Sequence, residues 1–470
     1  MAAPDWVRRA VFYQVFPDRF ARGERFKPDG VFESWDSPPT ELGFKGGDLY
    51  GVSERLDHLG DLGVNALYLN PIFQSPANHR YHASDYLQVD PVLGGDEALR
   101  ALLDAAHARG MRVVLDGVFN HCGRGFFPFV HLLENGDASP YRDWFHVRGW
   151  PLKAYEGTPN YACWYNLGAL PKFNTANPEV RRYLLRVARH WLAFGVDGWR
   201  LDVPNEIDDD AFWREFRTVC KGVNPEAYLV GEIWGEAKRW LQGDMFDAVM
   251  NYLLPAACLR YFAGEKLRVT HEYGGRPMAP IDAAAFRSEV RAMLGHYPAA
   301  VNLAQMNILT THDTDRMRTA YGGDERRMRL ALVFSFFVPG APSVYYGEEV
   351  GLDGTLAHGA RAAMPWDDSR WDRELLGLYR RLIRLRRTRP VFASGDFELL
   401  ETFGDLLAYE RRLPGERFAV LVNRSDAPVR APYSAEDLRG AAETVSSKSH
   451  PLGSGLELEP WGYSVLELRP

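Results

Sequence analysis

Eight short apolar runs alternate with helix-like segments along most of this chain of 470 residues. Several runs are followed at once by polar residues, such as the Thr-Thr-His-Asp sequence at 310–313. Strands that alternate with helices predict a parallel sheet, and near-continuous apolar runs indicate that the sheet is covered on both faces. Eight such repeats predict an α/β fold, a (β/α)8 TIM barrel. The expected strands are 10–16, 64–71, 111–119, 198–203, 228–232, 246–252, 305–309 and 342–346; the expected helices are 52–62, 96–109, 177–194, 281–296, 324–338, 374–387 and one that opens at 208–210.

Two parts of the chain interrupt this alternation. Residues 122–174 mix Gly, Pro, aromatic and short polar runs, and the segment is too long for an ordinary loop. It is predicted to be a subdomain inserted after the third strand. Beyond residue 389, short alternating runs at 397–400, 406–411, 418–423 and 462–468 predict a C-terminal all-β domain, a β-sandwich spanning 390–470. The barrel is then expected at 1–121 and 175–389.

Charge and cysteine content narrow the partners and the compartment. The net charge of −7 argues against nucleic acid or an anionic membrane surface as a partner. The N-terminal residues lack the apolar core of a signal peptide, and no apolar run approaches a membrane span. Four cysteines without a CxxC spacing predict neither a disulfide scaffold nor a structural zinc site. A cytoplasmic protein with reduced thiols is expected, with no nucleic-acid or membrane partner and no metal ligands.

The fourth expected strand carries a charged pair. Arg200 and Asp202 are two residues apart and therefore share one face of the strand. A guanidinium beside a carboxylate keeps that carboxylate ionised and oriented, and an ionised Asp at the carboxyl end of a strand is a candidate nucleophile. Taken alone, the pair could equally be a structural ion pair.

Two more carboxylates, Glu232 and Asp313, follow expected strands. Polar residues at the carboxyl ends of barrel strands converge at one rim. Carboxylates that lie close together repel, which raises the pKa of at least one of them, and a protonated carboxyl can act as a general acid. A nucleophile beside a general acid/base is what retaining glycoside hydrolysis requires. The three carboxylates together therefore favour a catalytic site over three separate structural residues.

These segments, in this order, resemble the α-amylase superfamily over nearly the whole chain. Five motifs carry the resemblance: DGVFNH at 116–121, GWRLD at 198–202, GEIW at 231–234, THD at 311–313 and GAPSVYYGEE at 340–349. The resemblance implies that Asp202 is the nucleophile, Glu232 the acid/base and Asp313 the residue that stabilises the transition state. The expected enzyme is a retaining glycoside hydrolase.

The same resemblance implies the residues that contact the sugar. Arg200 is expected to orient Asp202, and His121 and His312 to bond sugar hydroxyls near the cleavage point. Tyr81 matches the family tyrosine that stacks under the sugar being cleaved. Asp116 and Asn120 are expected to brace the rim rather than to react.

Two shorter segments resemble neopullulanases, cyclomaltodextrinases and maltogenic amylases in particular. These are LPKFN at 170–174 and DVPNE at 202–206, where Glu206 would reach toward the acceptor side. Trp234 is either a sugar platform or a core residue. The resemblance implies cleavage of α-1,4 glucosidic bonds, with tolerance of α-1,6 bonds, in maltooligosaccharides, cyclodextrins or pullulan, and transfer of glycosyl units to sugar acceptors.

The sequence also departs from that group. Pro204 stands where the group usually has Ala, and the group's N-terminal β-domain has no counterpart, since the first strand begins near residue 10. A monomer or weak oligomer is therefore expected. The loop at 21–29 carries Arg25 and Lys27 instead of the oxygen ligands that calcium needs. No cofactor is expected to be required, with a weak calcium site near Asp48 as the alternative.

Two other functions remain open from the sequence. One is an exo-acting α-glucosidase or oligo-1,6-glucosidase, because the shape of the loops decides between exo and endo action. The other is a catalytically inactive sugar-binding protein, because a fold does not determine a function. The presence of all three carboxylates, Asp202, Glu232 and Asp313, favours an enzyme.

Overall fold

A barrel of eight parallel strands forms the centre of the computed structural model, which describes residues 3–269, 272–273, 277–356, 359–447 and 455–469. The strands follow the order β8-β7-β6-β5-β2-β1-β10-β9, and a parallel bridge between Met250 and Met306 joins the two ends of that order. The predicted (β/α)8 barrel is therefore confirmed. The strands are β1 Phe12–Val15, β2 Ala66–Leu69, β5 Arg112–Gly117, β6 Gly198–Leu201, β7 Tyr228–Gly231, β8 Ala248–Val249, β9 Met306–Asn307 and β10 Ala341–Tyr345.

Burial on both faces explains the apolar runs of the sequence. Every residue of β1, β2, β6 and β7 is buried, because side chains fill the barrel on one face and helices cover the other. β8 and β9 are the exceptions in length, with two residues each where longer strands were expected.

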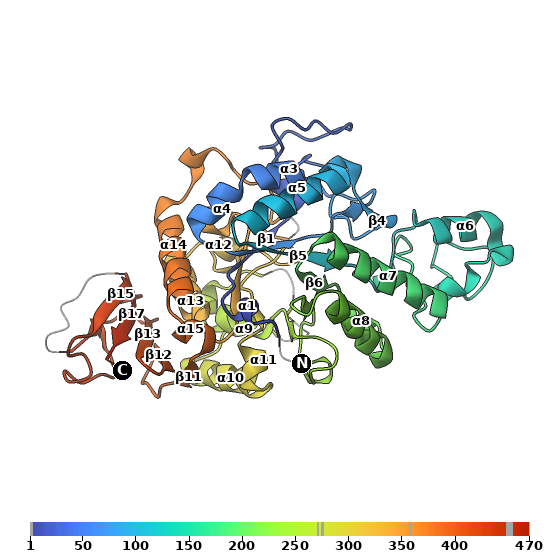
Figure 1. Cartoon of the computed structure of the whole chain (residues 1–470). Helices are drawn as coiled ribbons and strands as arrows, with labels where there is room; N and C mark the ends of the chain where they lie inside the picture. The colour runs from blue at the N-terminus through green and yellow to red at the C-terminus, as the bar shows by residue number, and fades with distance from the viewer. Residues whose placement is uncertain (1–2, 270–271, 274–276, 357–358, 448–454, 470) are drawn as a thin grey trace.

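The helices around the barrel begin and end at the signals that the sequence carries. In α7, the side chain of Asn177 accepts the Glu179 N–H at 2.8 Å, and Gly195 ends the helix in a left-handed conformation with φ of 119°. Helices packed on the barrel are seen in Figure 1. The longer ones are α5 Gly95–Ala108, α7 Pro178–Phe194, α8 Asp210–Val223, α10 Ala283–Gly295, α13 Glu325–Phe336 and α14 Arg373–Thr388; the shorter ones are α1 Asp5–Arg8, α2 Pro17–Phe20, α9 Leu253–Cys258, α11 Ala299–Asn302, α12 Met317–Ala320 and α15 Val391–Ser394.

The helix expected at 52–62 differs from the prediction. It begins earlier, because Asp48 accepts the Gly51 N–H at 2.8 Å as an N-cap, and it breaks at Arg55 into two helices. These are α3 Leu49–Glu54 and α4 Leu56–Leu62.

Residues 122–174 project from the barrel beside α7 (Figure 1). The segment holds α6 Phe127–Asn135 and is joined by isolated antiparallel bridges, such as Val147 with Tyr161 and Cys163 with Pro171. Its interior is aromatic: the buried rings are Phe126, Phe129, Trp144, Phe145, Tyr161 and Phe173.

The C-terminal part folds as a five-stranded antiparallel sheet in the order β11-β12-β13-β17-β15. Alternate residues of β12 point to two different cores. Leu407 and Tyr409 pack with the barrel, and Leu406 and Ala408 pack with a smaller cluster that includes Tyr433, Leu438 and Leu458. The short pair β14–β16 was not expected from the sequence. The strands are β11 Asp396–Leu399, β12 Leu406–Leu413, β13 Glu416–Asn423, β14 Val429–Arg430, β15 Ala442–Ser446, β16 Glu457–Leu458 and β17 Tyr463–Leu468.

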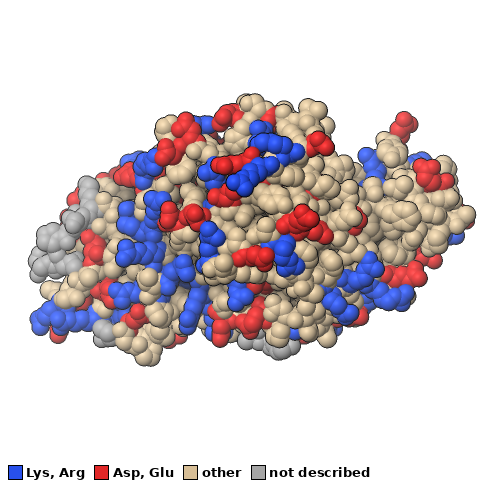
Figure 2. Space-filling model, turned by 45° about the horizontal axis from the view of Figure 1, so that its top comes forward, with Lys and Arg blue, Asp and Glu red and all other residues tan. Residues whose placement is uncertain are grey.

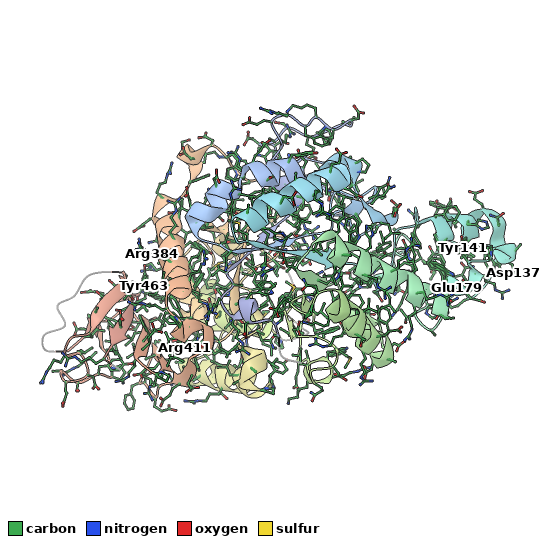
Figure 3. All side chains as sticks on the ribbon, in the orientation of Figure 1. Asp137, Tyr141, Glu179, Arg384, Arg411 and Tyr463 are labelled. Carbon is green, nitrogen blue, oxygen red and sulfur yellow. The ribbon has the colours of Figure 1, made fainter. Side chains whose placement is uncertain are left out.

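Two buried arginines, one from α14 and one from the sheet, hold the segment between α13 and β10. Arg386 of α14 donates to the Gly340 carbonyl at 2.6 Å, and Arg411 of β12 donates to the Phe337 carbonyl at 2.6 Å. Burial lowers the pKa of Arg386 to about 9 and that of Arg411 to about 10. Figure 3 labels Tyr463, where the sheet lies beside α14, and Arg411, lower in the sheet near α15. The barrel and the C-terminal sheet therefore share one continuous core.

The surface carries charges of both signs. Acidic and basic side chains are interspersed over the face that Figure 2 shows. Among the described helices, none combines the length and the apolar character needed to cross a membrane.

Candidate active site

The carboxyl ends of the central strands bring the predicted residues together. Asp116 of β5 lies beside Arg200 of β6 in register. The ladder continues past the strand ends, since the Asp202 N–H donates to the Gly117 carbonyl at 3.0 Å and the Glu232 N–H to the Leu201 carbonyl at 2.9 Å. Side chains that alternate along neighbouring strands therefore meet at one rim of the barrel.

Arg200 lies at the centre of this group and is fully buried. Its Nη1 donates to Asp116 Oδ1 at 2.8 Å and to Asp202 Oδ1 at 2.9 Å. Its Nη2 lies 3.0 Å from Glu232 Oε1. One guanidinium thus contacts three carboxylates, which fixes their positions relative to one another.

Burial and mutual repulsion make Asp202 and Glu232 hard to ionise together. Burial raises the pKa of Asp202 well above its ordinary value, and it also raises the pKa of Glu232. Arg200 makes a hydrogen bond to Asp202, whereas its Nη2 approaches Glu232 without hydrogen-bond geometry. Arg200 therefore stabilises the ionised form of Asp202 through a hydrogen bond that Glu232 lacks.

Glu232 is held by the residue that follows Asp202. The Val203 N–H donates to Glu232 Oε2 at 3.1 Å, and Trp234 Nε1 donates to Glu232 Oε1 at 3.1 Å. Val203 has φ of 35° and ψ of 51°, a left-handed conformation that a β-branched residue rarely adopts. Strain of this kind persists where the surroundings enforce it. Here it turns a backbone N–H toward a carboxylate.

Asp313 has two partners of its own. His312 Nε2 lies 3.0 Å from Asp313 Oδ2, and Arg361 Nη2 donates to Asp313 Oδ1 at 2.9 Å. Although burial opposes ionisation, His312 and Arg361 lower the pKa of Asp313 below its ordinary value. Asp313 is therefore ionised at neutral pH.

Tyr81 links His312 to Asp116. Its hydroxyl donates to Asp116 Oδ2 at 2.7 Å and lies 2.6 Å from His312 Nε2, and its ring stacks on His312 at 5.5 Å between centroids. Tyr81 follows β3 Phe73–Gln74 and precedes β4 Asp85–Val89. The Tyr68 hydroxyl also donates to Asp116 Oδ2 at 2.7 Å, so Asp116 braces the rim with Arg200 on its other oxygen.

The remaining predicted residues, His121, Trp234 and Glu206, lie around this centre with partners of their own. His121 is buried, stacks on Trp164, and has its pKa lowered by burial to about 3, so its imidazole is neutral. Trp234 stacks on Tyr252 with centroids 3.9 Å apart while it donates to Glu232. Glu206 is exposed on the turn after Asp202, where its backbone carbonyl accepts Lys172 Nζ at 2.5 Å.

Three contacts were not found by sequence reasoning: those of Arg361, Tyr68 and Val203. Arg361 lies in the loop after β10, and its Nε also donates to the His312 carbonyl at 2.8 Å. Arginines are common in loops, and only the three-dimensional path of this loop brings Arg361 to Asp313. The strand-eight motif just before the loop was the one signal that could have drawn attention to it.

A lysine occupies the region where the calcium alternative was raised. Lys45 is fully buried, and its Nζ donates to the Ser34 carbonyl at 2.6 Å, the Ser37 carbonyl at 2.7 Å and the Ser37 hydroxyl at 2.6 Å. Glu33 Oε2 lies 3.2 Å away. We call this the Lys45 cage. Asp48 accepts the N–H groups of Gly23 and Gly51 nearby, and the described residues contain no cluster of three or more His, Cys, Asp or Glu side chains able to hold a metal ion.

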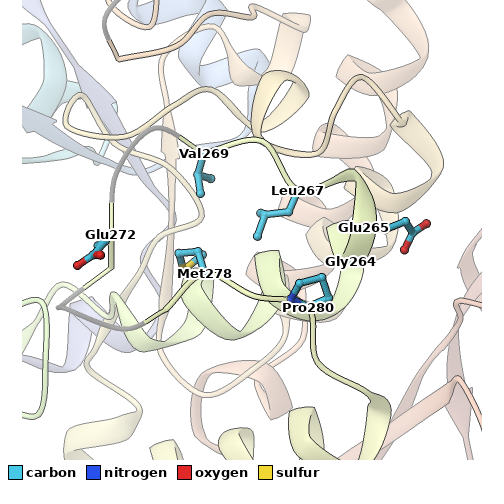
Figure 4. A pocket seen from close by; sticks show the side chains of 7 residues that line it. All are labelled: Gly264, Glu265, Leu267, Val269, Glu272, Met278 and Pro280. Carbon is cyan, nitrogen blue, oxygen red and sulfur yellow. The ribbon is translucent and has the colours of Figure 1, made fainter.

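A separate hollow is lined by the segment that follows α9 (Figure 4). None of the residues that line it is one of the predicted site residues. They are Gly264, Glu265, Leu267, Val269, Glu272, Met278 and Pro280.

Comparison with known proteins gives consistent matches. The family model "Alpha amylase, catalytic domain" matches residues 14–375. A cyclomaltodextrinase of a Bacillus species is 44% identical over 90% of this chain and 74% of its own length, and neopullulanase 2 of Thermoactinomyces vulgaris is 41% identical over 89% and 70%. A solved structure of cyclic α-maltosyl-(1→6)-maltose hydrolase from Arthrobacter globiformis, in complex with cyclic α-maltosyl-(1→6)-maltose, has a TM-score of 0.90 and 39% identity over 99% of this chain and all of that one.

Proposed function

The chain belongs to the α-amylase family of glycoside hydrolases, and we propose that it is a retaining α-glucan hydrolase and transglycosylase whose nucleophile is Asp202. The observation that carries this proposal is the contact of one buried guanidinium, that of Arg200, with Asp116, Asp202 and Glu232. This contact supports an ionised Asp202 beside a Glu232 carboxyl that keeps its proton. Retention requires this pair.

The proposed reaction has two steps. Asp202 attacks the anomeric carbon while Glu232 gives its proton to the departing glycosidic oxygen, so a glycosyl–Asp202 ester forms and the C–O bond to the leaving chain breaks. Glu232, now a carboxylate, then takes a proton from water or from a sugar hydroxyl, whose oxygen displaces Asp202. Water gives hydrolysis, and a sugar gives transfer. Ionised Asp313 offsets the positive charge that develops at the anomeric carbon.

Neutral donors and acceptors around the carboxylates suit sugar hydroxyls. We assign His121, His312 and Tyr81 to the sugar being cleaved, Trp234 to a ring contact beside Glu232, and Glu206 to the acceptor side. His121 supports this because its neutral imidazole can both donate and accept.

The proposed substrates are maltooligosaccharides, cyclodextrins or pullulan, cut at α-1,4 and also at α-1,6 bonds. The names of the two enzymes that are 44% and 41% identical, a cyclomaltodextrinase and a neopullulanase, support this choice. So does the structural neighbour whose substrate carries an α-1,6 linkage.

Product analysis tests the substrate range. Maltotriose, β-cyclodextrin, pullulan and starch are incubated in parallel with the enzyme and with Asp202→Asn as the inactive control. Fast attack on the small and cyclic substrates, with maltose or panose as products, is expected. Glucose alone from chain ends would assign the protein to the α-glucosidases instead, and no product from any substrate would favour a sugar-binding protein.

We also propose a cytoplasmic protein that is a monomer or weak oligomer and needs no metal. The four free cysteines support a reducing compartment. Sedimentation equilibrium over a range of concentrations checks the oligomeric state.

A further inference from the structure

The inserted segment exposes aromatic rings on an almost uncharged surface. Tyr155 is 75% exposed and Tyr165 is 82% exposed. Between residues 149 and 171 only Lys153 and Glu156 carry charge. In Figure 2 the middle of the lobe at the right of the molecule is tan, and charged side chains lie around its edges. A surface of this kind suits a neutral ligand with flat apolar faces better than a charged one.

The backbone holds Tyr165 outward. Tyr165 has φ of 53° and the next residue, Asn166, has φ of 59°. Two consecutive left-handed residues other than Gly are uncommon, and such a conformation persists where its surroundings enforce it. Hydrogen bonds close the turn, since the Trp164 N–H donates to the Leu170 carbonyl at 3.0 Å and the Leu167 N–H to the Trp164 carbonyl at 2.9 Å. The exposed ring is therefore carried by a fixed turn.

Tyr155 is oriented by a different contact. The guanidinium of Arg124 lies 4.4 Å from the centre of its ring and also donates to the Ala154 carbonyl. A side chain at Gly168 would lie 3.3 Å from the Ala154 carbonyl, so the segment of Tyr155 lies against the turn that carries Tyr165. The two tyrosines thus belong to one end of the insertion.

A row of rings joins this surface to the active site. His121, after β5 at the barrel rim, stacks on Trp164 at 5.6 Å, and Trp164 contacts Tyr165 at 5.3 Å between centroids. A ligand that leaves the rim along these rings arrives at Tyr165. Because the rings are continuous with the active site, the ligand expected at this surface is the substrate of that site.

We propose that Tyr155 and Tyr165 form an outer sugar-binding surface that holds an α-glucan chain beyond the catalytic cleft. The inference rests on the proposed function, because the ligand is the substrate of that site. Each exposed ring offers a face for stacking on the apolar face of a glucose unit. A short substrate that fills only the cleft does not reach this surface, whereas a longer one does.

The test compares short and long substrates. Steady-state kinetics with maltotriose and maltoheptaose are measured for Tyr155→Ala, Tyr165→Ala and the double variant. Each single change is expected to raise KM for maltoheptaose about two- to tenfold while leaving maltotriose unchanged. Tyr165→Phe keeps the ring and is expected to keep the wild-type KM. Phe403→Ala, which removes a 94% exposed ring in the C-terminal part, is the matched control and is expected to change neither.

Direct binding separates this inference from the proposed reaction. Calorimetry of maltoheptaose with Asp202→Asn, alone and combined with the tyrosine changes, is expected to show the same loss of affinity without turnover. If the wild-type enzyme cuts no glucan, the proposed function fails, yet this binding comparison still tests the surface. Equal effects on both substrates, or none on either, would overturn the proposal. A change in sedimentation with unchanged binding would assign the surface to contact with a second copy instead.

Discussion

At the scale of single residues, the site depends on which of its neighbouring acids carries a proton. Arg200 and Arg361 each stabilise a carboxylate as an anion, Asp202 and Asp313 respectively. Glu232 receives N–H donors from Val203 and Trp234 but no hydrogen bond from a guanidinium. The two arginines therefore each favour the anion of one carboxylate, which is consistent with the proposed role of Glu232 as the proton donor.

Glu232→Gln is expected to lower kcat at least about a thousandfold on ordinary glucans, because the departing oxygen no longer receives a proton. With an α-glucosyl fluoride, whose leaving group needs little protonation, azide is expected to restore turnover and give a glucosyl azide of retained configuration. Chromatography and NMR of the product check this. Inverted azide, or no azide product at all, would exclude Glu232 as the acid/base of a retaining enzyme.

The pH profile of kcat/KM is expected to fall on its basic side as Glu232 loses its proton. Burial raises the pKa of Glu232, so this limb lies above the ordinary Glu value of about 4.3. In Glu232→Gln the basic limb should disappear from the residual activity. A basic limb that stays in place would assign it to another group.

Arg361→Met is expected to lower kcat about ten- to a hundredfold and to raise the pKa of Asp313. The sign follows because His312 and Arg361 lower the pKa of Asp313, and without the arginine Asp313 takes up a proton at a higher pH. Arg361→Lys, which keeps the charge, should lower kcat less, and steady-state kinetics measure both variants. Equal losses of kcat in the two variants would point to a structural role alone.

At the scale of elements, local sequence signals located the helices and strands well, and long-range contacts decided the rest. Caps such as Asn177 and Gly195 act within a few residues, so α7 was readable from the sequence. β8 and β9 shorten at the closing seam of the barrel, where neighbours far along the chain set the length of pairing. The position of Arg361 could not be predicted for the same reason. The pairing of β14 with β16 could not be predicted either, because it joins residues almost thirty positions apart in the sequence.

The Lys45 cage sets the stability of the loop between α2 and α3. Lys45→Met is expected to lower the unfolding free energy by about 3–5 kcal/mol, because Glu33 and two carbonyls lose a buried cation. Lys27→Met, at an exposed lysine of the same loop, is the control and should have little effect. Chemical denaturation measures both changes. A chelator is expected to leave the wild-type midpoint unchanged, and a clear drop with EDTA would instead indicate a bound metal ion.

At the scale of the whole molecule, the barrel and the C-terminal sheet act as one body. Tyr409 and Phe418 pack on Phe334 and Phe392, rings that come from the barrel helix α13 and from α15. The sequence predicted the change to β-structure after residue 389, but it did not predict that the new sheet would be buried on both faces. Arg411 satisfies a backbone carbonyl across this junction, and nothing in the sequence distinguished it from an ordinary surface charge.

A chain that ends at residue 390 is therefore expected to lose soluble expression, because Phe334 and Phe337 would be left without their cover. Arg411→Met, in the full chain, should lower the melting temperature while calorimetry still shows one transition. Two separate transitions in the wild-type protein would mean that the two parts unfold independently.

The closing of the barrel also has a consequence for the time at which the protein can fold. β1 pairs with β10, with Phe12 opposite Ser343, and the ribosome makes one long before the other. At about 5–20 residues per second, β1 waits roughly 15 to 70 s for its partner. During that interval β1 can pair only with β2. The C-terminal sheet that covers α13 has not yet been synthesised. The nascent chain therefore spends most of its synthesis as an open barrel, and chaperones that bind exposed apolar strands have that long to act.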